Sequence, residues 1–205
     1  VSASSLFGTN VTTKKDTIIE IASVLIFSAI NNGDKAGVIF YSNKIELYIP
    51  PKKGKQHALY IVRELLSVKA KTRGTKLSTA LKYFTNTSKQ KSIAFILSDF
   101  IDTNYQDMLR VAANKHDVVG IKIYDKMDMQ LPRIGMLRVE DPETGVQKWV
   151  DTKSRWVRHE YEKEFFRITD YANLVFKRSG ANLLHVRTDE DYVRVLQQFF
   201  ISRNR

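Results

Sequence analysis

The hydrophobic positions of this chain fall into blocks that alternate between a helical and a strand-like period. Residues 14–32 are apolar on most of a helical circumference, which predicts a helix buried against a sheet. Helical spacing recurs further along the chain at 55–67, 75–85, 106–115, 154–179 and 188–202. Short, nearly continuous apolar runs are typical of buried parallel strands, and they occur at 36–41, 91–97, 117–124 and 181–186.

Two hairpins are also predicted. Residues 44–49 alternate between polar and apolar, and Ser42-Asn43 links them to the run at 36–41. We expect the second strand of this hairpin to be an antiparallel edge strand that ends at Pro50-Pro51. The segments 136–139 and 146–150 flank a turn-rich loop and predict the second hairpin.

Strands that alternate with helices predict one α/β domain over residues 1–205, with a doubly wound, mostly parallel sheet and helices on both faces. Such sheets bind ligands at the carboxyl ends of their strands. The chain starts where a first central strand would be ending, so we expect that strand to precede Val1.

Four oxygen-bearing residues stand where this architecture places ligands. Ser2 and Ser4 open the chain, Thr75 precedes a predicted helix, and Asp99 closes an apolar strand. Hydroxyl and carboxylate oxygens are ligands that Mg²⁺ accepts, with water completing its shell. The chain has no cysteine, and its histidines (57, 116, 159 and 185) show no ligand spacing, so a zinc site is not indicated.

Each of these residues also has a purely structural interpretation. Ser2 and Ser4 suit a turn at a strand end, and Thr75 suits the N-cap of a helix that begins at Lys76. Asp99 could cap the turn that follows its strand. We interpret Asp102 as a solvated residue at a helix start.

The net charge of +11 is concentrated in the first part of the chain, where residues 1–90 hold 14 Lys and Arg against 5 Asp and Glu. Six of these basic residues are our candidates for contacting a partner: Lys52, Lys53, Lys55, Lys71, Arg73 and Lys76. Such a cluster favours an acidic protein, a phosphate backbone or an anionic membrane surface. A merely solubilising surface is the other interpretation.

Ser2, Ser4, Thr75 and Asp99 resemble four of the five positions of the metal-ion-dependent adhesion site of von Willebrand factor A domains. More narrowly, the chain resembles the bacterial domain of unknown function family 58. The matching stretches are residues 1–4, 33–40, 96–100, 116–121 and 141–145. The leading Asp of the adhesion motif would stand immediately before Val1 and is not in this chain, so we expect weakened Mg²⁺ binding.

The resemblance implies a non-catalytic protein-binding module in the bacterial cytoplasm. An acidic residue of the partner would complete the Mg²⁺ shell, and the implied role is that of adaptor or co-chaperone for a MoxR-type AAA+ ATPase. One rival is a nucleic-acid-binding protein that uses the cluster from Lys52 to Lys76. Another is a Mg²⁺-dependent phosphohydrolase, in which Asp102 or Asp125 would supply a second carboxylate beside Asp99.

Overall fold

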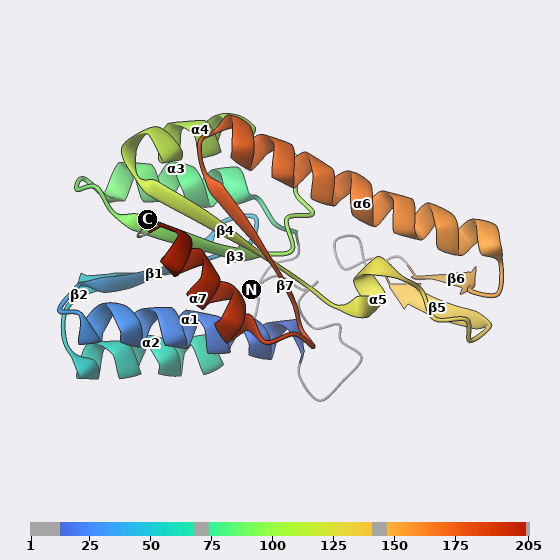
Figure 1. The fold of residues 1–205 in the computed structure, drawn as a ribbon, viewed down its shortest axis with the longest axis horizontal. Coiled ribbons are helices and arrows are strands. Elements are labelled where there is room, and N and C mark those ends of the chain that lie inside the picture. Colours follow the sequence, from blue (N-terminus) through green and yellow to red (C-terminus); the bar gives the residue numbers. More distant parts are fainter. Residues whose placement is uncertain (1–12, 68–73, 141–146, 204–205) are drawn as a thin grey trace.

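The computed structural model describes residues 13–67, 74–140 and 147–203, in which helices and strands alternate along the chain (Figure 1). The helices and strands, in chain order, are α1 (Lys14–Asn31), β1 (Ala36–Tyr41), β2 (Ile45–Lys52), α2 (Lys55–Ser67), α3 (Leu77–Thr87), β3 (Ile93–Ser98), α4 (Gln106–Lys115), β4 (Asp117–Tyr124), α5 (Lys126–Met129), β5 (Met136–Glu140), β6 (Gln147–Asp151), α6 (Arg155–Arg178), β7 (Asn182–Arg187) and α7 (Tyr192–Arg203). None of the helices in these ranges is long and apolar enough to cross a bilayer.

The centre of the fold is a parallel sheet with the strand order β3-β4-β7. Ile93 of β3 is in register with Asp117 of β4, and Val119 of β4 is in register with Asn182 of β7. The three carboxyl ends therefore lie at one edge, which we call the carboxyl edge. The mixed α/β prediction with parallel strands is confirmed at this level.

Helices cover both faces of this sheet, and successive side chains of β4 point alternately into the two cores that the helices form with it. Val118 belongs to a core with α3, α4 and α6, whereas Ile121 and Ile123 belong to a core with α1 and α7. On the α6 side, a Cβ on Gly120 would lie 2.5 Å from the Phe176 ring, so only glycine fits there. The sheet is thus buried on both sides, as its apolar strands require.

The first predicted hairpin is present, but one detail of it was wrong. Among the described residues β1 pairs with β2 in antiparallel orientation, as the hairpin predicts, and the parallel pairing expected for β1 stays a prediction. Pro50-Pro51 does not end β2, which continues to Lys52. The register shifts between Ala36 and Val38, and such a bulge accommodates prolines that cannot donate to the ladder.

The second predicted hairpin, β5–β6, projects beyond the carboxyl edge together with the start of α6 (Figure 1). The buried residues of α6 are Ala172, Val175 and Phe176, all in the part of the helix that packs on the sheet. Ser154 caps the helix by accepting from the Val157 amide, as its predicted start requires. A large part of α6 therefore extends away from the α/β core.

Candidate binding site at the carboxyl edge

Asp99 follows the last residue of β3 and lies at a sharp turn of the backbone. The next residue, Phe100, has a φ of 55°, which is unusual for a bulky side chain. Its ring is buried and meets the Phe176 ring edge-on at 5.1 Å, and its amide donates to the Ser98 hydroxyl at 3.1 Å. Packing therefore fixes the strained turn, and it leaves Asp99 half-buried at the carboxyl edge.

A buried lysine holds the same turn from the neighbouring strand. The ammonium of Lys122, a β4 residue, donates to the backbone carbonyl of Asp99 and lies 5.4 Å from the centre of the Phe165 ring. Burial lowers the pKa of Lys122 to about 8, although the charges of Asp99 and Asp128 act to raise it. Lys122 thus fixes the position of the Asp99 backbone.

Asp102 connects the Asp99 loop to the start of α3. Its carboxylate accepts from the amide of Leu77 at 2.8 Å and from the amide of Asn104 at 3.0 Å. Our expectation of a solvated helix-start residue was wrong for Asp102, because its carboxylate caps a helix distant in sequence. Thr75, which precedes Leu77 by two residues, therefore lies on a loop tied to the loop of Asp99.

Thr75 itself is half-buried and is not the N-cap that we considered. The N-cap of α3 is Lys76, whose side chain makes no capping hydrogen bond, and the helix starts at Leu77, one residue later than this interpretation requires. The Lys76 amide donates to the carbonyl of Ser42, which follows β1, at 2.9 Å. The end of β1 thus joins the Thr75 and Asp99 loops at one edge.

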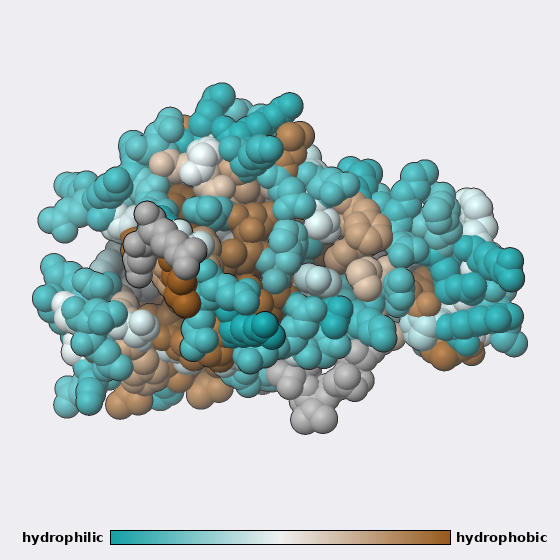
Figure 2. Space-filling view, viewed as in Figure 1, coloured by the Kyte–Doolittle hydropathy of each residue, from teal (hydrophilic) through white to brown (hydrophobic). Residues whose placement is uncertain are grey.

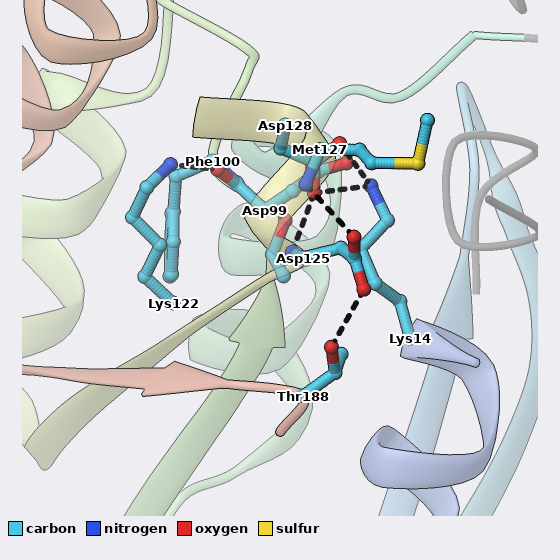
Figure 3. A network of polar contacts seen from close by, with 9 residues as sticks. Lys14, Asp99, Phe100, Lys122, Asp125, Met127, Asp128 and Thr188 are labelled. Carbon is cyan, nitrogen blue, oxygen red and sulfur yellow. Dashed lines mark hydrogen bonds and ion pairs between the residues drawn. The ribbon is translucent and has the colours of Figure 1, made fainter. Parts of the chain in front are cut away.

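A buried polar network lies beside Asp99, at the end of β4 (Figure 3). The Lys14 ammonium lies 3.0 Å from both carboxylate oxygens of Asp128, which also accepts from the Asp125 amide at 2.7 Å. The Asp125 carboxylate accepts from the Met127 amide at 2.9 Å and from the Thr188 hydroxyl at 2.8 Å. Lys14 and Asp125 are 3% and 2% exposed, so the network ties α1, α5 and the loop after β7 together in the interior.

Sequence reasoning missed this network and misassigned one of its members. Thr188 and Asp191, three residues apart at the start of the last predicted helix, have the spacing of a capping box, but Thr188 does not form one because its hydroxyl donates to the Asp125 carboxylate. Asp191 caps α7 alone, by accepting from the Val193 amide at 3.0 Å. The short helix α5 carries a real capping box, formed by Asp125 and Asp128, and this acidic spacing was the signal that could have revealed it.

The four predicted metal ligands divide into two pairs. Thr75 and Asp99 lie on loops that Asp102 holds together, whereas Ser2 and Ser4 are outside the described residues. Within residues 13–67, 74–140 and 147–203, no three carboxylate or imidazole side chains stand close enough to share a metal ion. The predicted ligand set contains one carboxylate and three hydroxyls, so the lack of such a group does not test it. The Mg²⁺ site remains a prediction.

The described members of the basic cluster do not form one patch. Lys52, in register with Ala36 at the start of β1, lies with the exposed Lys53 and Lys55 at the end of the hairpin opposite to the carboxyl edge. Lys76 is exposed at the carboxyl edge. Lys71 and Arg73 are outside the described residues. The described basic candidates are therefore divided between two ends of the fold.

Comparison with known sequences identifies relatives of unknown function. The profile of a family described as "Protein of unknown function DUF58" matches residues 1–169. The uncharacterized proteins Rv1480 of Mycobacterium tuberculosis and Mb1516 of Mycobacterium bovis are each 26% identical to this chain, in alignments that cover its full length. The chain spans 65% of the length of these two relatives.

Two solved structures share the fold at 13% sequence identity. BatB from Bacteroides thetaiotaomicron has a TM-score of 0.58, covering 96% of this chain and 90% of BatB. An aerotolerance-related membrane protein from Bacteroides fragilis has a TM-score of 0.61, with coverage of 96% and 91%. At this level of identity the likeness concerns the fold alone.

Proposed function

The chain belongs to the DUF58 family, and we propose that it is a non-catalytic module of the von Willebrand A type that binds a protein through Mg²⁺ at the carboxyl edge. The observation that carries this proposal is the hydrogen bond from the Leu77 amide to the Asp102 carboxylate, which joins the loops of Thr75 and Asp99. Ser2 and Ser4 would supply the remaining protein ligands. An acidic side chain of the partner would complete the Mg²⁺ shell.

The partner that we propose is a MoxR-type AAA+ ATPase in the bacterial cytoplasm, for which the chain would act as adaptor or co-chaperone. This part rests on the resemblance of the sequence to von Willebrand A domains of the family. The rigid Asp99 turn supports it, because a preorganised ligand loses little conformational entropy when a partner binds.

The engagement of the neighbouring carboxylates supports binding over hydrolysis. A phosphohydrolase would need a second carboxylate at Asp99 to act as a base or metal ligand. The Asp102 carboxylate accepts hydrogen bonds from two backbone amides, and the Asp125 carboxylate accepts them from an amide and a hydroxyl. Both carboxylates therefore have a structural role. The separation of Lys52 and Lys53 from Lys76 likewise weighs against a single nucleic-acid-binding patch.

The test measures the affinity of two purified proteins for the MoxR-type ATPase of the same organism. One protein is the present chain, and the other is a version extended upstream of Val1. We expect binding in Mg²⁺ that is lost in EDTA and in Asp99→Asn. Asp107→Asn is the matched control, since Asp107 is an exposed acid on α4. Equal binding by the Asp99 variant and the wild type, or binding that persists in EDTA, would contradict the proposal.

A further inference from the structure

The hairpin β5–β6 and the first turn of α6 form a projection that we call the arm, residues 133–140 and 147–158. The 24 residues of α6 make a helix about 36 Å long. The Phe165 ring meets Tyr124, the last residue of β4, with 5.3 Å between ring centres. The part of α6 before Phe165 therefore extends past the carboxyl edge, and the arm projects from the end of the sheet at which β3 ends, one residue before Asp99 (Figure 1).

Large apolar side chains are unusually exposed on the arm. Trp149 and Trp156 are 65% and 71% exposed, and Ile134 and Met136 are 62% and 61% exposed. On the hairpin, Trp149 stands opposite Arg138, so both side chains share one face. Tryptophan is highly buried on average, so two exposed indoles on one projection indicate a surface that a partner covers.

The exposed charges of the arm are mostly positive. Its exposed basic residues are Arg133, Arg138, Lys148, Lys153 and Arg155. Asp151 is the exposed acidic residue among the arm positions whose side chains the structure describes. In the space-filling view the projecting end is hydrophilic over most of the visible face, with a small hydrophobic group at its lower margin (Figure 2).

We propose that the arm is a docking surface for an acidic protein segment that carries apolar side chains. The arm combines tryptophan, methionine and arginine, which are the residues enriched in the cores of protein interfaces. Acidic side chains of the segment would pair with the arginines, and its apolar side chains would cover the indoles. If the proposed function holds, one partner can reach both the arm and Asp99, but the docking chemistry does not depend on the metal.

The two indoles provide the readout, because Trp149 and Trp156 are the two tryptophans of the chain. The probe is a synthetic peptide obtained by selecting a tryptophan-free, phage-displayed random library on the wild-type chain. We expect the selected peptides to be rich in Asp, Glu and apolar residues. Their binding should shift the tryptophan emission to shorter wavelength, since it removes the indoles from water.

Reversing charges on the arm distinguishes peptide binding at this surface from a general attraction of acidic peptides to a basic protein. The double variant Arg133→Glu/Arg155→Glu should weaken peptide binding about tenfold or more. An acid at position 155 lies in the first turn of α6, where it favours the helix. Lys89→Glu/Lys91→Glu makes the same change of charge just before β3, at the end of the sheet opposite to the carboxyl edge, and should leave the affinity unchanged.

A second variant tests the apolar part of the surface. Trp149→Ser/Trp156→Ser should weaken binding of a fluorescein-labelled peptide about 30-fold, measured by anisotropy. Asp99→Asn should bind the peptide as the wild type does, so failure of the Mg²⁺-dependent ATPase interaction and failure of the arm proposal are separate results. Failure to select acidic peptides, or equal binding by Arg133→Glu/Arg155→Glu, would overturn the proposal. So would an emission shift produced by phosphatidylglycerol vesicles and by no peptide, which would assign the arm to a membrane surface.

Discussion

The carboxylate of Asp102 lies 2.8 Å from the backbone nitrogen of Leu77 and caps the start of α3. The N-cap residue Lys76 gives the helix no side-chain acceptor, so Asp102 replaces a local cap with one from the loop after β3. One bond thus stabilises a helix and fixes the distance between two loops. The proposed function depends on this relationship, because Thr75 and Asp99 belong to those loops.

We predict that Asp102→Ala lowers the free energy of unfolding by about 1–2 kcal/mol, the usual effect of losing a helix cap. The measurement is urea denaturation followed by circular dichroism. Asp34→Ala, in which an exposed acid is removed from the loop between α1 and β1, is the control and should change stability by less than about 0.5 kcal/mol. Equal stability of the two variants would contradict the capping role of Asp102.

The ion pair of Lys14 and Asp128 predicts an asymmetric effect of its two partners. The Lys14 side chain is 4% exposed and that of Asp128 is 22% exposed. Asp128→Asn leaves a buried ammonium without its counter-charge, so we expect a loss of about 3 kcal/mol or more, and a smaller loss for Lys14→Met.

The double variant Lys14→Met/Asp128→Asn should recover part of this stability, because it removes the unpaired charge. A double-mutant cycle in urea measures the coupling. Strictly additive losses would mean that the two side chains do not stabilise each other.

Gly120 provides a test of the packing between β4 and α6. A Cβ at this position would stand 2.5 Å from the Phe176 ring and 2.7 Å from Leu183, so we expect Gly120→Ala to destabilise the fold by about 1–3 kcal/mol. Phe176→Leu should relieve part of the clash, so the double variant should lose less than the sum of the single losses. Thermal unfolding of the four proteins checks this, and a neutral Gly120→Ala would contradict the described contact.

His116 predicts how stability depends on pH. The side chain is 3% exposed, its ring nitrogens have no hydrogen-bond partner among the described residues, and burial lowers its pKa below 6.5. The unfolded chain therefore takes up a proton at a pH where the folded chain does not. The contribution of His116 to stability is complete above pH 6.5 and falls as the pH drops from 6.5 through its folded-state pKa.

The measurement is urea denaturation between pH 5 and 8. His116→Leu removes the titrating ring, so its stability should fall less steeply than that of the wild type below about pH 6.5. His159→Gln changes an exposed histidine and should retain the wild-type slope. A slope that is the same in His116→Leu and in the wild type would contradict this assignment.

Sequence periodicity was sufficient where the apolar positions of an element alone decide which side chains it buries. The predicted bounds of α2, α4 and β4 agree with the structure, and the apolar positions of β4 supply both cores. Periodicity failed where a contact distant in sequence decides the outcome. Asp102 caps α3 from another loop, and Thr188 bonds to Asp125 instead of capping its own helix.

The proline pair at 50–51 failed for a related reason. Proline usually ends a strand because it cannot donate to the ladder. Here a bulge opposite Gly37 lets β2 continue, and a Cβ on Gly37 would lie 2.8 Å from both the Ile49 carbonyl oxygen and the Pro51 nitrogen. The continuation of β2 therefore depends on Gly37 in its partner β1, and the residue pattern of β2 alone does not contain this information. Of the candidate site, the sequence located the Asp99 turn but not the buried lysines around it.

The central claim is that Thr75 and Asp99 bind one Mg²⁺ ion at the carboxyl edge, and calorimetric titration with Mg²⁺ tests it most directly. The titration is made on the chain and on a version extended upstream of Val1. We predict one Mg²⁺ per extended chain, a weaker response from the present chain, and loss of binding in Thr75→Ala and Asp99→Asn but not in Asp107→Asn. Mg²⁺ binding that is the same in all these variants, or absent from the extended chain, would contradict the account.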